Sequence, residues 1–103
     1  MQQLSQQQWA DQKAAADDAY VLDVRTPEEY AEGHLEGSHL LDIRNPQGFM
    51  DGAEKLDKSL SYFIYCRSGA RSAQACQLLD QMGVKATFNL DGVILAWTGN
   101  IIQ

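Results

Sequence analysis

The sequence predicts an α/β fold in which a mostly parallel sheet is flanked by helices on both faces. Short apolar runs of strand length alternate along the chain with segments of helical periodicity. Such alternation is typical of parallel strands joined by helical crossovers, which cover both faces of the sheet. The 103 residues suffice for one domain, and we expect it to span residues 1–103.

The first expected element is a helix over residues 5–15. Ser5 and Gln8 have the spacing of a capping box, in which two side chains accept hydrogen bonds from backbone N–H groups at a helix start. Leu4 and Trp9 have the spacing of a hydrophobic staple, which fixes the direction of entry into the helix. We expect this helix to pack on the fold rather than to carry chemistry.

A buried strand and a short helix are expected next. The run over residues 20–24 is mostly apolar, as in strands that are covered on both faces. Thr26 can cap the following helix, Pro27 would occupy its first position, and Glu29 would complete a capping box. Gly33 is expected to end this helix, because glycine is favoured just beyond a helix C-terminus.

The middle of the chain has the weakest signals. A second short strand is expected over residues 38–43. The stretch over residues 45–56 allows a helix, because three apolar residues in it would share one helical face: Phe49, Ala53 and Leu56.

The pattern is clearest in the carboxyl-terminal half. Residues 61–65 are expected to form a strand. A helix is expected over residues 70–82, with one apolar face and one face rich in glutamine, and Gly83 is expected to end it. Residues 86–90 are expected to form another strand, and residues 92–97 a last helix.

Composition and charge exclude several classes of partner. The formal net charge of −6 disfavours non-specific binding to nucleic acids or membrane surfaces, and we expect neither as a partner. No apolar run approaches the roughly 18 residues of a membrane span. The amino end has no signal-peptide pattern, so we expect a cytoplasmic location, or a periplasmic one if a signal peptide has been removed.

The two cysteines have no metal-site or redox-pair spacing. Cys66 and Cys76 do not form a CxxC pair, and His34 and His39 are not at zinc-site spacing from them, so we expect neither a metal nor a cofactor. Cys76 would lie on the apolar face of its helix, about 9 Å along the axis from the helix start. We expect it to be a core residue that is too far from Cys66 for a disulfide.

Chemistry is expected around Cys66, which follows the strongest predicted strand. In parallel sheets, sites form beyond the carboxyl ends of the strands. Gly69 permits a sharp turn whose N–H groups face inward, and the following helix presents its positive end. Arg67 and Arg71 add two positive charges. Cysteines in such settings have pKa values of about 3.5–7.5, so we expect Cys66 to be a reactive thiolate.

The same turn is expected to bind anions. Because the chain repels anions overall, an anionic substrate needs a local positive site. Backbone donors and guanidinium groups provide one. We therefore expect the substrate to be bound by Arg67, Ser68, Gly69, Ala70 and Arg71.

Three segments of the chain resemble signatures of the rhodanese family. Residues 65–72, with the sequence YCRSGARS, resemble the family's active-site loop. Residues 22–38, which include LDVR, EY and GHLEGS, resemble its amino-terminal signature. Residues 90–97, with LDGV followed by AW, resemble its carboxyl-terminal signature. Where the family often has two glycines, this chain has Asp91 and Gly92.

The resemblance implies a three-layer α/β sandwich and an enzyme of the thiosulfate sulfurtransferase type. In the implied reaction, the Cys66 thiolate takes a sulfane sulfur from an anionic donor, either thiosulfate or a persulfide. A Cys66 persulfide then passes this sulfur to cyanide or a thiol, and a sulfur-accepting protein is a further candidate partner. On this view residues 67–71 form the substrate cradle, while Asp23 and Arg25 support the fold nearby.

Two other functions remain open at this level. Phosphatases and arsenate reductases of related fold have five residues between the cysteine and the arginine, whereas four residues separate Cys66 from Arg71 here. The shorter spacing favours sulfur transfer, because a tetrahedral oxyanion needs a larger loop. A non-catalytic binding or sensing module is the other alternative, although such domains usually lose the cysteine.

Overall fold

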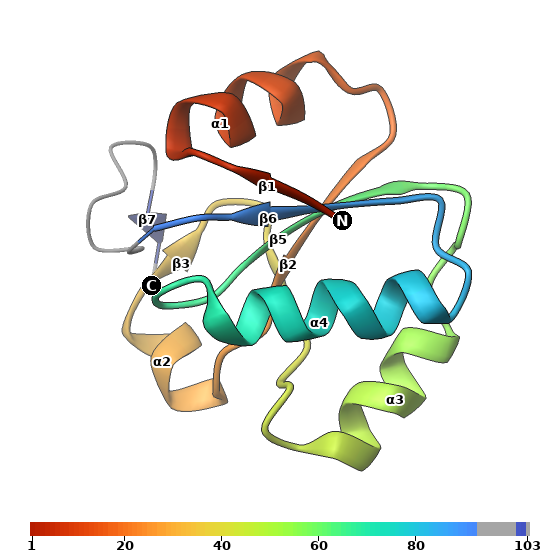
Figure 1. The fold of residues 1–103 in the computed structure, drawn as a ribbon. Helices are drawn as coiled ribbons and strands as arrows, with labels where there is room; N and C mark the ends of the chain where they lie inside the picture. Colours follow the sequence, from red (N-terminus) through yellow and green to blue (C-terminus); the bar gives the residue numbers. More distant parts are fainter. Residues whose placement is uncertain (93–100, 103) are drawn as a thin grey trace.

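The strands of the central sheet all run in the same direction (Figure 1). The computed structural model describes residues 1–92 and 101–102. In spatial order the strands are β1 (Gln2–Leu4), β6 (Ala86–Leu90), β5 (Ser61–Tyr65), β2 (Ala19–Asp23) and β4 (His39–Leu40). The helices in the described residues are α1 (Gln6–Ala15), α2 (Pro27–Glu32), α3 (Pro46–Glu54) and α4 (Ala70–Gln81). A separate antiparallel pair joins β3 (His34–Leu35) and β7 (Ile101–Ile102).

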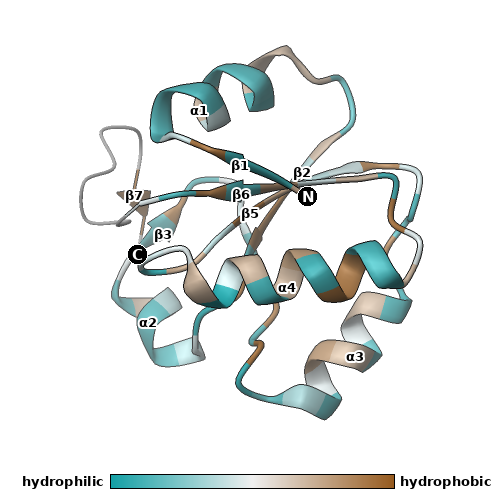
Figure 2. Ribbon diagram, viewed as in Figure 1, coloured by the Kyte–Doolittle hydropathy of each residue, from teal (hydrophilic) through white to brown (hydrophobic). Residues whose placement is uncertain are grey.

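Helices cover both faces of this sheet, which confirms the expected three-layer α/β fold. One face carries α1, and the other carries α3 and α4 (Figure 1). Along β5, Phe63 and Tyr65 enter the hydrophobic core beneath α1, whereas Tyr62 and Ile64 enter the core beneath α3 and α4. A strand buried on both faces needs apolar side chains in both directions, so its sequence is a nearly continuous apolar run. In Figure 2 brown, hydrophobic stretches recur along the central strands, while α4 shows both hydrophilic and hydrophobic residues.

The helix ends follow the predicted local signals. The Ser5 side chain caps α1 and forms a capping box with Gln8. Thr26 caps α2 in the same way with Glu29, and Gly33 follows the last residue of that helix. These contacts satisfy backbone N–H groups that have no partner within their own helix. The predicted caps are therefore confirmed.

The carboxyl-terminal predictions agree closely with the structure. The strands β5 and β6 coincide with the predicted ranges, and α4 ends one residue before the predicted end. The weakly signalled helix in the middle of the chain forms as α3, which Asn45 caps. The helix expected over residues 92–97 falls almost wholly outside the described residues. None of the described helices combines the length and the apolar character that crossing a bilayer requires.

The short strands were not predicted correctly. The strand expected over residues 38–43 is shorter, because only His39 and Leu40 pair with β2. Three strands in the described residues were missed: β1, β3 and β7. The first of these contains Gln2 and Gln3, which are exposed at the sheet edge, so no apolar run marks it. It pairs with β6, which is distant in the sequence, and no local pattern can indicate such a pairing.

Candidate active site

Cys66 lies directly after the carboxyl end of β5, in the turn that leads into α4. The turn residue Gly69 has a φ angle of +96°, in the left-handed region that favours glycine. A Cβ atom at this position would also lie 3.3 Å from the Leu90 carbonyl oxygen. The turn therefore rests against the end of β6, and both observations require glycine at position 69.

Hydrogen-bond donors converge on the sulfur of Cys66. The Gly69 N–H donates to Sγ at 3.0 Å, and the Ser72 hydroxyl oxygen lies 3.3 Å from it. Burial acts to raise the pKa of this thiol. Hydrogen bonds from the Ser72 hydroxyl and from the N–H groups of Ser72, Ser68 and Gly69 outweigh that effect and lower the pKa. Because the side chain is 1% exposed, protein donors rather than water must stabilise its thiolate.

Ser72 connects the sulfur to a buried amide. Its hydroxyl group makes a short hydrogen bond with Asn89 Oδ1. The Asn89 amide donates to the Gly69 carbonyl at 3.2 Å and to Gln3 Oε1 at 2.9 Å, so its oxygen must face Ser72. A hydroxyl group has one proton, and Cys66 Sγ and Asn89 Oδ1 are both acceptors for it when the thiol is ionised. Asn89 therefore holds the turn and also competes for the Ser72 proton.

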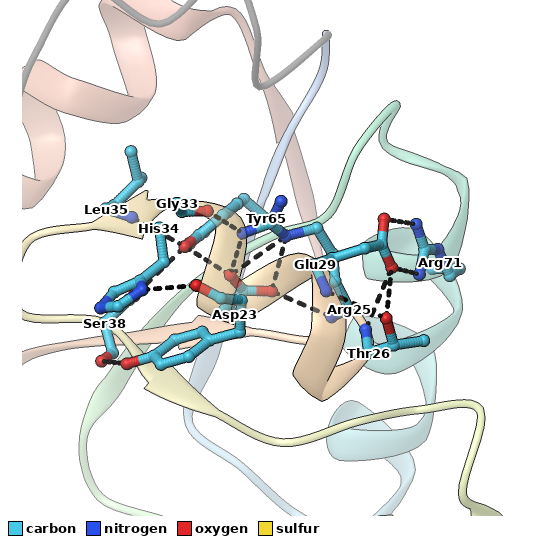
Figure 3. Close-up of polar contacts among 11 residues, drawn as sticks. Asp23, Arg25, Thr26, Glu29, Gly33, His34, Leu35, Ser38, Tyr65 and Arg71 are labelled. Atoms are coloured by element: carbon cyan, nitrogen blue, oxygen red, sulfur yellow. Dashed lines mark hydrogen bonds and ion pairs between the residues drawn. The ribbon is translucent and has the colours of Figure 1, made fainter. Parts of the chain in front are cut away.

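Arg71 is engaged in a bidentate ion pair at the start of α4. Its Nη1 and Nη2 groups donate to the two carboxylate oxygens of Glu29 at 2.7 and 2.9 Å, across from α2 (Figure 3). This contact is the main reason that the pKa of Glu29 falls to about 2, and it also raises the pKa of Arg71. The pair therefore persists at any pH near neutrality.

A second ion pair, which is buried, supports the region behind the turn. Arg25 Nη2 donates to Asp23 Oδ2 at 2.6 Å and to the Gly33 carbonyl at 2.7 Å (Figure 3). The Tyr65 hydroxyl donates to Asp23 Oδ2 at 2.7 Å and accepts from the Leu35 N–H at 3.0 Å. Burial raises the pKa of this Tyr65 hydroxyl, which stays protonated as a donor. The network fixes the strand that carries Cys66, as expected for Asp23 and Arg25.

The predicted cradle residues have different surroundings. Arg67, Ser68 and Ala70 are exposed along the turn, while Gly69 is buried in it. In the part of the chain that the structure describes, Arg67 has no ion pair, whereas Arg71 faces Glu29. The backbone of Asp91 also lies beside the turn, with its Cα 3.8 Å from the position of a Cβ on residue 69.

Three residues of this site were not assigned a role by the sequence. Ser72 belongs to the loop motif, but nothing in the sequence indicates that its hydroxyl reaches the sulfur. Asn89 interrupts an apolar strand, and an amide at a buried strand position is a signal that could have identified it. Glu29 was interpreted only as a capping residue. The capping role is confirmed, but Glu29 also contacts Arg71, which the capping pattern does not indicate.

Cys76 has none of the contacts that favour ionisation at Cys66. It is fully buried in α4 among apolar residues, and both cysteines are free. Burial is the main cause that raises its pKa to about 12, despite a hydrogen bond from Thr87. Cys76 is therefore a core residue, as predicted.

Comparisons with known proteins agree with this geometry. A family model described as the rhodanese-like domain matches residues 5–100. The chain is 38% identical to YtwF of Bacillus subtilis over 86 residues, which cover 82% of this chain and 79% of that protein. It is also 38% identical to a sulfurtransferase of Allochromatium vinosum over 84 residues, which cover 82% of this chain and 76% of the other.

A solved structure has the same fold over nearly the whole chain. The rhodanese-like domain protein from Staphylococcus aureus has a TM-score of 0.79 and 26% sequence identity, covering 97% of this chain and 94% of that one. The family match, the identity to these relatives and the turn around Cys66 lead to one assignment. The chain belongs to the rhodanese-like domain family.

Proposed function

We propose that this chain is a sulfurtransferase that carries sulfane sulfur as a persulfide on Cys66. The observation that carries the proposal is the set of donors around Sγ, which lowers the pKa of a thiol that burial alone would keep protonated. A buried thiolate with fixed donors is a strong nucleophile that needs no separate general base. The sulfurtransferase name of a 38% identical relative supports the same chemistry.

The reaction has two balanced steps. The Cys66 thiolate attacks the outer sulfur of thiosulfate or of an organic persulfide. The bond behind that sulfur breaks, and its electron pair leaves with sulfite or with the donor's thiolate. The attacking thiolate of an acceptor, or cyanide, then forms a bond to the terminal sulfur of the Cys66 persulfide. The second cleavage restores the Cys66 thiolate, so no oxidant or cofactor is consumed.

The donors of the turn can stabilise Cys66 both as a thiolate and as a persulfide. The Gly69 N–H and the Ser72 hydroxyl can donate to the thiolate before transfer and to the anionic persulfide after it. Exposed groups at Arg67 and Ser68 provide further donors for an anionic donor molecule. A small-molecule sulfur donor, a thiol or cyanide acceptor, and a protein acceptor are all consistent with this arrangement.

Intact mass spectrometry after incubation with a donor tests the proposal. Treatment with thiosulfate or glutathione persulfide should add one sulfur atom to the wild-type chain. The addition should disappear in Cys66→Ser and remain in Cys76→Ser, because the pKa of the Cys66 thiol is lowered whereas that of Cys76 is raised to about 12. Subsequent cyanide treatment should remove the added mass and release thiocyanate. An unmodified wild-type chain with both donors would contradict the proposal and favour a binding module.

A phosphatase assay tests the nearest alternative. The arginine that would hold a phosphate in such an enzyme corresponds to Arg71, and Glu29 occupies it here. We therefore expect no hydrolysis of p-nitrophenyl phosphate above the rate of Cys66→Ser. Cys66-dependent hydrolysis without sulfur transfer would reverse the assignment.

A further inference from the structure

We propose that Glu29 is a specificity-determining residue of this site, because its ion pair with Arg71 disfavours dianionic sulfur donors. The preferred donors are organic persulfides, in which the transferred sulfur is bonded to the sulfur of a thiol and the two sulfurs carry at most one negative charge. This inference rests on the proposed sulfur transfer through Cys66 and specifies which class of donor the same site takes.

The first observation is that Glu29 occupies both outer positions of the Arg71 guanidinium. Two hydrogen bonds of 2.7 and 2.9 Å join the two side chains in a fork geometry. An oxyanion that binds this fork must displace Glu29. An oxyanion that binds the remaining N–H groups of Arg71 meets a guanidinium whose charge Glu29 already balances.

The second observation concerns the charges beside the turn. Arg67 lies on the turn, two ion pairs, Arg25–Asp23 and Arg71–Glu29, lie next to it, and the backbone of Asp91 lies beside it. Each ion pair has no formal net charge, so neither pair offsets the negative charge of the Cys66 thiolate. In the described residues only Arg67 among these guanidinium groups has no ion pair, and it is exposed to screening by water and salt.

The chemistry of the two donor classes differs in this environment. Thiosulfate brings two negative charges to a thiolate and leaves as dianionic sulfite. An organic persulfide, RS–SH or its anion RS–S⁻, brings at most one negative charge on its two sulfurs. The Cys66 thiolate takes the terminal sulfur, and the electron pair of the broken S–S bond leaves with the thiolate RS⁻. Like charges a few ångströms apart near a protein surface repel each other more strongly than they would in bulk water. A site in which Glu29 already balances the charge of Arg71 therefore discriminates between thiosulfate and organic persulfides.

The Glu29→Gln variant tests the role of this carboxylate. Glutamine retains the oxygen that accepts from the Thr26 N–H at 3.1 Å, so the capping box of α2 is kept. It removes the charge that opposes a dianion. We expect the rate constant for Cys66 persulfide formation by thiosulfate to rise about tenfold, and that for glutathione persulfide to change by less than about twofold.

Glu28→Gln is the matched control. Glu28 is the neighbouring carboxylate on the first turn of α2 and is exposed, so this variant makes the same change in net charge. Both rate constants should stay within about twofold of wild type. The gain of Glu29→Gln should also shrink as salt is raised, since screening weakens the interaction that the charge exerts. A purely structural effect would not depend on salt in this way.

Further outcomes separate this inference from the proposed function. If neither donor modifies wild-type Cys66, the proposed function fails. If wild type reacts with both donors and Glu29→Gln slows thiosulfate or changes both donors alike, the function stands and the specificity role of Glu29 is wrong. Should that variant not fold, Asp91→Asn provides the test, with a smaller rise for thiosulfate expected. An unchanged rate constant for thiosulfate in Asp91→Asn would likewise contradict the proposed electrostatic effect.

Discussion

Cys66 and Cys76 are equally hidden from solvent, yet their thiols have opposite tendencies to ionise. Their side chains are 1% and 0% exposed, and both belong to the core beneath α3 and α4. The pKa of Cys66 is lowered, whereas that of Cys76 is raised to about 12. Burial opposes ionisation at both positions, so burial cannot account for the difference.

The difference arises from the backbone around each sulfur. Cys76 lies inside α4, where the backbone N–H groups are used by the helix itself. Cys66 lies just before that helix, where the first N–H groups have no partner within the helix and are free to donate to its sulfur. Position relative to a helix start, rather than depth, separates the thiol whose pKa is lowered from the thiol whose pKa is raised in this protein.

The largest expected effect is a difference in alkylation between the two thiols. At pH 7 a thiol with a pKa of about 12 is ionised in only about one molecule in 10⁵. We expect iodoacetamide to modify Cys66 in the folded protein at least about a hundredfold faster than Cys76. Peptide mapping after timed quenching measures both rates in one sample. Equal rates, or modification of Cys76 alone, would contradict the inferred difference in ionisation between the two thiols.

A smaller effect is expected when one donor to the sulfur is removed. In Ser72→Ala the Cys66 thiolate loses a hydrogen bond, so its pKa should rise and its alkylation at pH 7 should slow about five- to tenfold. The pH profile should move to higher pH while its plateau stays near the wild-type value. Thr87→Val is the control, because it removes a buried hydroxyl near Cys76 and leaves the turn intact. An unshifted profile in Ser72→Ala would show that the Ser72 hydroxyl proton stays with Asn89.

The smallest expected effect is on stability. Cys76→Ala removes a sulfur atom from a packed core and should lower the free energy of unfolding by about 1 kcal/mol. Sulfur transfer through Cys66 should be unchanged, since the donors to its sulfur are Gly69 and Ser72 rather than Cys76. Urea unfolding followed by fluorescence measures the first quantity and the mass assay the second. A stable variant with altered transfer would mean that Cys76 has a part in the chemistry.

The sequence predicted the elements that local patterns specify. The strand over residues 61–65 is apolar because both its faces are buried, and the helix after it has an apolar stripe and a glycine stop. The two capping boxes are contacts within four residues and are visible in the sequence for that reason. The edge strand β1 has only Leu4 buried, so its formation depends on pairing with a distant partner.

The site was predictable only in part, for the same reason. The position of Cys66 before a helix and the need for glycine at residue 69 follow from neighbours in the sequence. The contacts of Arg71 with Glu29 and of Ser72 with Asn89 join residues 42 and 17 positions apart. They depend on how α2 and β6 pack beside α4, which a single sequence does not specify.

The hydrogen bond between Asn89 and Gln3 has a practical consequence for anyone who purifies this protein. It connects the second residue of β1 to the amide that holds the turn around Cys66, and it lies two residues from Met1. An affinity tag fused directly to Met1 would disturb the position of β1 and, through the hydrogen bond between Gln3 and Asn89, the position of the turn. Assays on tagged preparations should therefore be repeated with the tag cleaved, or with the tag moved to the opposite terminus.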